Sequence, residues 1–169
     1  MPPPSFREAF DSLAPAMFRY LRRLTGSRSD AEEIVQNAFL KLHVEMTRGV
    51  QPTNVKAWLF RVATNEARDL QRERVVRARD EALPRVTNVV DFESRLHAQQ
   101  ITRQALLRLP PRMRQVLLLW SEGFSYREIA EVTGIETGYV GVLLQRARAA
   151  FKREYEQLET VAGSRSNTP

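Results

Sequence analysis

The chain has 169 residues, which is enough for one moderate hydrophobic core or two small ones. It has no cysteine, which excludes disulfides and thiolate chemistry, and its two histidines are too few for an ordinary zinc site, so we expect no metal. The formal net charge of +6 favours a polyanionic partner, because cations that neutralise phosphates release counterions. No apolar run approaches the roughly 18 residues of a membrane span and no secretion signal opens the chain, so we expect a cytoplasmic protein without membrane insertion.

Apolar residues near the N-terminus recur at steps of three and four, which is typical of an amphipathic helix. They are Phe6, Phe10, Leu13, Met17, Leu21 and Leu24. Pro15 cannot donate a backbone hydrogen bond, so the pattern predicts a short helix followed by a longer one. Gly26 is the predicted C-terminal stop. With the segments that follow, this spacing predicts an all-α fold.

A second helix is expected to begin at a capping box, Ser29-Asp30-Ala31-Glu32, because acidic side chains are favoured at the positive end of the helix dipole. Its inward positions are Val35, Ala38, Phe39 and Leu42, and its outer positions are Glu33, Gln36, Asn37 and Lys41. On the residues alone, the simplest interpretation of the outer positions is an ordinary solvated face.

A third helix is predicted from Val55 to Arg79, and its two halves differ in character. The first half is apolar, and we expect Trp58 to lie in the core rather than to stack on a base. The second half carries Arg68, Arg72, Arg74, Arg77 and Arg79. This run fits a surface that follows a phosphate backbone, and it fits equally well a solvated helix end where the dipole favours cations.

The helical pattern fades between about residues 80 and 94, which divides the chain into two small helical domains. The predicted boundaries are a first domain over residues 1–80, a flexible linker over 81–94, a second domain over 95–158 and a disordered tail over 159–169. In the second domain, helices are expected over Leu96–Leu109 and from Pro111 to Gly123.

The second domain then carries the most specific local pattern. Ser125 and Glu128 form a predicted capping box before a short helix, and Gly134 suits the left-handed turn that joins it to a longer one. Two helices joined in this way predict a helix-turn-helix, whose second helix enters the major groove of DNA; a helical hairpin without DNA is the alternative.

The two faces of the longer helix follow from winding it at about 100° per residue. The core stripe holds Val140, Leu143, Leu144, Ala147 and Phe151. The opposite face holds Gly141, Val142, Gln145, Arg146, Ala149, Lys152 and Arg153. The leucines at the start of this helix are therefore expected in the core, while donors remain on the face that would meet DNA.

Three motifs, in order along the chain, resemble those of a known family. The segment "ALLRLPPRMRQVLLLWSEGFSYREIAEVTGI", followed by "VGVLLQRAR", resembles the fourth conserved region of bacterial sigma factors. The segments "SDAEEIVQNAFLKL" and "AWLFRVATNEARD" resemble the core-binding and promoter-melting parts of the second region. Their order and the short linker resemble the extracytoplasmic-function (ECF) group, which keeps only these two domains. The resemblance runs from about Phe6 to Tyr155.

By this resemblance, the protein is expected to give bacterial RNA polymerase its promoter specificity and not to be an enzyme. The resemblance places the upstream promoter element at Ser125, Tyr126, Arg127, Tyr139, Val142, Gln145 and Arg146. It places the downstream element, with a flipped base captured near Asn65, at Lys56, Arg61, Asn65, Arg68, Arg72 and Arg74. It places contact with the polymerase core at Glu32, Glu33, Gln36, Asn37, Phe39 and Leu40. Members of the group are often held by an anti-sigma factor, although no residue of this chain identifies one.

Two other classes of function are alternatives to this one. An autonomous helix-turn-helix transcriptional regulator would bind duplex DNA tightly without polymerase. A metal-dependent nuclease would need converging carboxylates, whereas Asp30, Glu32 and Glu33 crowd a helix start where the dipole accounts for them.

The chain departs from the family pattern at two positions of the longer helix. Family members commonly place a basic residue and a serine where this chain has Gly141 and Val142. This loss should remove one or two contacts, each well-made base contact being worth about 1–3 kcal/mol. We therefore expect Gln145 and Arg146 to read most of the upstream element.

Overall fold

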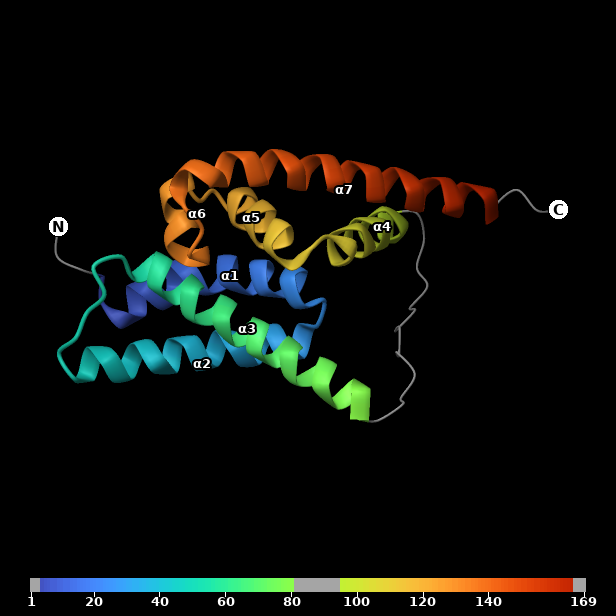
Figure 1. Ribbon diagram of the computed structural model, residues 1–169. Helices are drawn as coiled ribbons and strands as arrows, with labels where there is room; N and C mark the ends of the chain where they lie inside the picture. The colour runs from blue at the N-terminus through green and yellow to red at the C-terminus, as the bar shows by residue number, and fades with distance from the viewer. Residues whose placement is uncertain (1–3, 81–94, 166–169) are drawn as a thin grey trace.

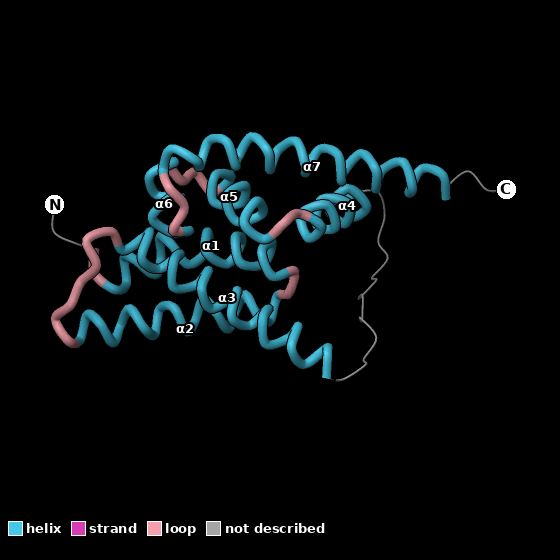
Figure 2. Tube along the Cα trace, viewed as in Figure 1, coloured by secondary structure: helices cyan, strands magenta, loops and turns pink. Residues whose placement is uncertain are grey.

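The structure is a computed structural model that describes residues 4–80 and 95–165. Within these ranges the chain forms seven α-helices and no β-strand, which confirms the predicted all-α fold. The helices are α1 (Phe6–Thr25), α2 (Arg28–Thr47), α3 (Val55–Asp80), α4 (Arg95–Arg108), α5 (Pro111–Ser121), α6 (Tyr126–Thr133) and α7 (Thr137–Arg165). Figures 1 and 2 show α1, α2 and α3 packed together, with α4 to α7 above them. Helix α5 packs against α1, and α6 packs against α3. The predicted linker lies outside the described residues.

Helix α1 is continuous through Pro15, so the predicted interruption at this residue is wrong. Pro15 is exposed, while Met17, Tyr20 and Leu21 on the other side of the helix are completely buried. The packing of this buried side outweighs the single backbone hydrogen bond that proline removes. Gly26 follows the helix in the left-handed conformation, with φ 74°, as the predicted stop requires.

Helix α2 begins at Arg28, and its N-cap is Ser27 instead of the predicted Ser29. The Ser27 hydroxyl accepts a hydrogen bond from the backbone N–H of Asp30 at 3.3 Å, and the Ser29 hydroxyl is bonded to that of Ser27. Glu32, the expected second half of the capping box, instead accepts from Arg28 at 2.8 Å. The start of α2 was therefore predicted two residues too late.

The other helices lie close to their predicted positions except at the C-terminus. Helix α3 spans Val55–Asp80, and Trp58 is half-buried against the core, as expected. Helix α7 continues to Arg165. The part of the expected disordered tail up to that residue is therefore helical, and residues 166–169 lie outside the described part of the chain.

One hydrophobic core runs through both halves of the chain. Within the first half, the hydroxyls of Tyr20 and Thr64 are hydrogen-bonded at 2.8 Å, and burial raises the pKa of Tyr20 well above its usual value. Between the halves, the rings of Phe60 on α3 and Phe124 before α6 meet edge to face, with centroids 4.7 Å apart. The two predicted domains thus pack directly against each other, which the sequence alone did not indicate.

Candidate nucleic-acid interface

The helix-turn-helix forms from α6 and α7, joined through Gly134 in the left-handed conformation at φ 70°. The predicted capping box is present, since the Ser125 hydroxyl accepts from the Glu128 backbone and the Glu128 carboxylate accepts from the Ser125 backbone N–H at 2.8 Å. The hydrogen bond from that backbone N–H is the main reason that the pKa of Glu128 is lowered. Ser125 therefore holds α6 in place, and its side chain already has a partner within the protein.

The two faces of α7 lie where the helical spacing places them. Val140, Leu143, Leu144 and Ala147 are buried and Phe151 is half-buried. Val142, Gln145 and Arg146 are exposed on the other side, together with Tyr139. Arg146 donates to the Tyr139 hydroxyl at 3.2 Å, which holds both side chains on this face. Ser125, Tyr126 and Arg127 at the start of α6 are also exposed, although the Ser125 hydroxyl is engaged in the helix cap.

Helix α3 carries the second group of predicted DNA contacts. At about 100° per residue, Arg61, Asn65, Arg68 and Arg72 lie on one stripe, and all four are exposed. Arg68 donates to the side-chain oxygen of Asn65 at 3.1 Å, which leaves the two amide hydrogens of Asn65 directed elsewhere. The asparagine that is predicted to capture a base is thus oriented by a neighbouring arginine.

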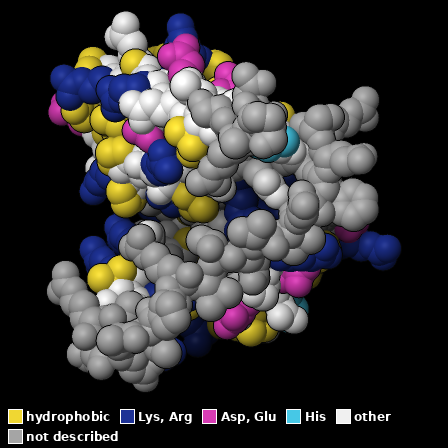
Figure 3. Space-filling model, turned by 90° about the vertical axis from the view of Figure 1, so that its right-hand side faces the viewer, with side chains coloured by type: hydrophobic (Ala, Val, Ile, Leu, Met, Phe, Trp, Pro, Cys, Tyr) yellow, Lys and Arg dark blue, Asp and Glu magenta, His cyan; other side chains and the backbone are white. Residues whose placement is uncertain are grey.

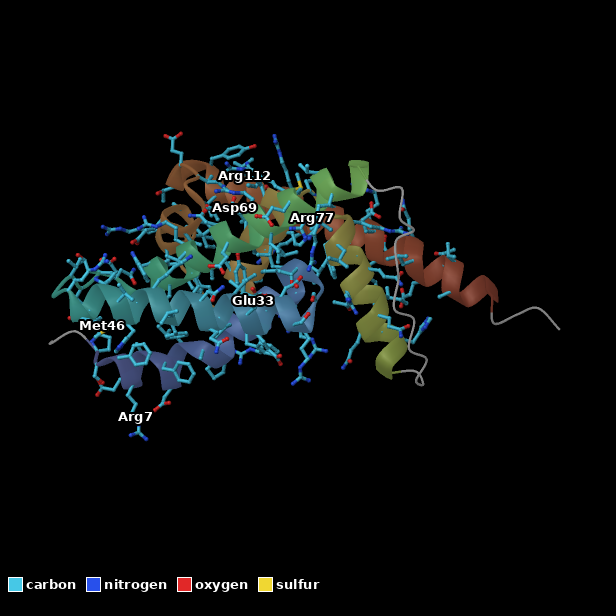
Figure 4. All side chains as sticks on the ribbon, turned by 90° about the horizontal axis from the view of Figure 1, so that it is seen from below. Arg7, Glu33, Met46, Asp69, Arg77 and Arg112 are labelled. Carbon is cyan, nitrogen blue, oxygen red and sulfur yellow. The ribbon has the colours of Figure 1, made fainter. Side chains whose placement is uncertain are left out.

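Part of this stripe borders a hollow of about 310 Å³ between the two domains. Residues from α3 and from α5 and α6 line it, among them Asn65, Arg68, Arg72, Arg74, Arg112 and Thr133. Figure 4, which views the molecule from below, shows Asp69 and Arg77 along α3, with Arg112 on the same side. Figure 3 shows Lys and Arg side chains on both the upper and the lower part of the face that it draws.

Arg74 differs from the other arginines of α3 because its partner is a buried carboxylate. Its guanidinium contacts both oxygens of the Asp30 carboxylate at 2.7 Å, and the Asp30 side chain is only 7% exposed. A charge that compensates a buried carboxylate is costly to remove, so Arg74 ties α3 to the first turn of α2. Arg74 therefore has a structural role, and it could hold a DNA phosphate, as predicted, only by giving up part of its contact with Asp30.

Lys56 lies away from Asn65, contrary to the predicted base pocket. It is about 140° from Arg61 around α3 and faces the second domain. Its ammonium lies 3.3 Å from a carboxylate oxygen of Glu128 and 4.0 Å from the centre of the Phe124 ring. In this arrangement Lys56 joins the two domains and does not complete a pocket around Asn65.

Two further residues at this contact were not singled out from the sequence. Glu122 pairs with Arg19 at 3.0 Å and lies 3.9 Å from Arg23, and its side chain is only 6% exposed. Arg114 is buried, and it donates to the backbone oxygen of Leu24 in the first domain at 3.0 Å. Arg114 belongs to the motif that resembles sigma region 4, but its partner in α1 is distant in sequence, and no local pattern indicates such a pair.

The surface predicted to contact polymerase is smaller than expected. Glu32, Glu33, Gln36 and Leu40 are exposed on α2, and Leu40 is 60% exposed. Phe39 is buried against the rings of Phe6 and Phe10, so it supports this surface from within and is not part of it. Asn37 is half-buried and donates to Glu66 of α3 at 2.6 Å.

Val44 extends this surface and was not predicted. It lies one turn beyond Leu40 on α2 and is 38% exposed. Leu40 and Val44 thus form a short exposed apolar stripe along α2. In the part of the chain that the structure describes, no helix is long and apolar enough to cross a membrane.

Comparison with known proteins agrees with this architecture. Residues 9–76 match the family "Sigma-70 region 2", and residues 99–151 match "Sigma-70, region 4". The ECF RNA polymerase sigma factor SigE of Mycolicibacterium smegmatis is 34% identical over 160 residues, covering 88% of this chain and 61% of SigE, so the chain spans less than two thirds of that relative.

A second relative is matched over most of its length. The RNA polymerase sigma factor CarQ of Myxococcus xanthus is 30% identical over 165 residues, covering 94% of this chain and 90% of CarQ. Among solved structures, the sigma factor RpoE in complex with the anti-sigma factor NepR, from Bartonella quintana, shares the fold, with a TM-score of 0.76 and 24% identity over 89% of this chain and 96% of that one. The chain therefore belongs to the sigma-70 family of RNA polymerase sigma factors, in its ECF group.

Proposed function

We propose that this chain directs a bacterial core RNA polymerase to two-part promoters and starts the melting of their DNA. The observation that supports these roles is that one chain has three exposed surfaces. Two of them, on α7 and on α3, are suited to DNA, and the third, on α2, is partly apolar. A regulator that acts alone needs the first of these surfaces, whereas an initiation factor needs all three. We infer that the chain acts in the cytoplasm and has no catalytic activity of its own.

The upstream element is assigned to the face of α7. Gln145 and Arg146 supply hydrogen-bond donors, and amide and guanidinium groups make paired contacts with base edges in the major groove. The hydrogen bond to the Tyr139 hydroxyl orients Arg146. Arg127, in the first turn of α6, is exposed and can contact a phosphate.

The downstream element is assigned to the stripe on α3. A base that leaves the duplex loses a few kcal/mol of stacking and pairing, which its pocket must offset. The Asn65 side chain offers a donor and an acceptor, and Arg68 fixes its orientation. Arg61 and Arg72 lie on the same stripe, where they can hold the phosphates on either side of the base.

Contact with the polymerase is assigned to Glu33, Gln36, Leu40 and Val44 on α2. Lys56, which pairs with Glu128 across the domain contact, becomes available to DNA only if the two domains separate. An anti-sigma factor is a further expected partner, by analogy with RpoE, which was solved in complex with NepR.

The test is transcription by purified core polymerase from a library of randomised promoters, with and without the protein. We expect initiation that depends on the protein and converges on two short elements with a fixed spacing. If the polymerase neither binds the protein nor initiates, while the protein alone retains specific duplexes, the proposal is overturned in favour of an autonomous regulator.

A further inference from the structure

Gly141 stands in the first part of α7, on the face that the proposed function assigns to DNA. A glycine inside a helix destabilises it relative to alanine. The usual compensation is a backbone conformation that other residues avoid, and four glycines of the described chain have it: Gly26, Gly49, Gly123 and Gly134. Gly141 is not among them, so what matters at this position is the absence of a side chain.

The ring of Tyr126 occupies the space that a side chain at Gly141 would need. A Cβ atom built on Gly141 lies 3.3 Å from Cε2 of Tyr126, closer than ordinary carbon contacts. Tyr126 is the first residue of α6, and its side chain nevertheless remains 47% exposed. One edge of the ring, at Cε2, therefore lies close to Gly141, while much of the residue remains exposed to solvent.

Two exposed residues of α7 that lie near Gly141 in the sequence are also unusual for a surface that binds DNA. Val142, directly after Gly141 on α7, is 42% exposed, and Tyr139, two residues before it, is 43% exposed. The corner between α6 and α7 thus presents two tyrosines and a valine where charged or small polar side chains would be expected. Apolar side chains at such a corner favour the methyl group of thymine, and a hydroxyl can donate to or accept from a base edge.

We propose that Tyr126, seated on Gly141, is a specificity-determining residue for the upstream promoter element. The tyrosine of α6 takes the place on the groove face that a side chain of α7 would otherwise fill, and with Val142 it selects a thymine at the base pair opposite this corner. Gly141 is the positioning residue, since only a residue without a side chain lets the ring approach α7 so closely. This inference rests on the proposed function and names the residues that read one part of the element.

The experiment is promoter selection by the holoenzyme from the randomised library, comparing the wild type with Gly141→Ala, Tyr126→Ala and the double variant. We expect Tyr126→Ala to lose discrimination at one base pair by roughly 5- to 150-fold, as for one good base contact. Gly141→Ala should lose discrimination at the same base pair to a smaller extent, because the added Cβ displaces the ring without removing it. The double variant should lose no more than Tyr126→Ala, because the alanine at 141 acts only by displacing the ring.

Gly138→Ala is the matched control, since a Cβ there meets nothing within 4 Å on the same helix. It should leave the selected element unchanged, and all variants should bind core polymerase like the wild type. Selection of the wild-type element by both Gly141→Ala and Tyr126→Ala would overturn the inference while leaving the proposed function standing. A wild-type protein that supports no initiation at all would instead remove the proposed function.

Discussion

Arg114 should be one of the most important residues for the stability of the closed arrangement of the two domains. Its guanidinium is buried and donates to three backbone oxygens, at 3.0 Å to Leu24, 2.8 Å to Leu107 and 3.2 Å to Leu109. Leu24 lies in the last turn of α1 and Leu107 in the last turn of α4, where backbone oxygens lack helical partners and carry partial negative charge. One cation therefore satisfies the ends of two helices from different domains.

The effect of Arg114→Met can be estimated from these contacts. Each buried oxygen left without a partner costs about 1–3 kcal/mol, so the loss of all three hydrogen bonds would cost at most about 9 kcal/mol. Burial lowers the pKa of Arg114, so the cation itself is desolvated at some cost, and methionine recovers that part. We expect a net loss of about 2–4 kcal/mol in the free energy of unfolding, and for a chain of this size a Tm lower by about 4–16 °C.

Urea and thermal unfolding followed by circular dichroism measure this loss directly. Arg112→Met is the matched control, because Arg112 is exposed on the same helix and its contact, with the backbone oxygen of Thr133, is long at 3.5 Å. The control should change stability by less than about 0.5 kcal/mol. If Arg114→Met behaves like the control, the guanidinium does not hold the two helix ends and this account of the domain contact is wrong.

Four further results are expected. Glu122→Gln should lower the free energy of unfolding by about 1 kcal/mol in urea unfolding, since both arginine partners are half-exposed. Because the pKa of Glu128 is lowered, its stabilising effect is present above pH 4.5 and lost as the pH falls through the lowered value, so Glu128→Gln should flatten the acid side of a stability–pH profile. Leu40→Glu should weaken core polymerase binding about tenfold or more in a fluorescence titration, whereas Val161→Glu, equally exposed on α7, should not. Asn65→Ala should weaken promoter opening, read by permanganate reactivity, more than polymerase binding, and equal loss of both would refute its role.

The helices and the faces of the helix-turn-helix could be predicted because they depend on local spacing. Val140 and Leu144 lie in the core because residues four apart share a face, and Ser125 caps α6 because Glu128 follows three residues later. The same rule placed the start of α2 wrongly, because two serines near this start can act as the N-cap. Ser27, and not Ser29, has the extended backbone of an N-cap residue and accepts the hydrogen bond from Asp30. The prediction at Pro15 was wrong for a related reason. The backbone hydrogen bond that proline removes is a local cost, and packing in the folded chain outweighs it.

The contact between the domains could not be predicted, because its partners are far apart in sequence. Lys56 and Glu128 each fit a local role, in DNA binding and in helix capping, and nothing in either segment indicates that they meet. Phe60 and Phe124 lie in segments assigned to separate domains, and their rings pack together across the contact. Apolar spacing tells which side of a helix is buried, but not which helix covers it.

The strength of this contact decides whether it is compatible with the proposed function. Ion pairs with half-exposed partners, such as Lys56 with Glu128 and Arg19 with Glu122, contribute about 0–1 kcal/mol each. The pair of Phe60 and Phe124 adds about 0.5–1.5 kcal/mol beyond the area that it buries, and Arg114 adds a few more. These contributions keep Lys56 paired within the protein in the absence of a partner, so polymerase binding releases Lys56 only if it favours the separated arrangement by more than their sum.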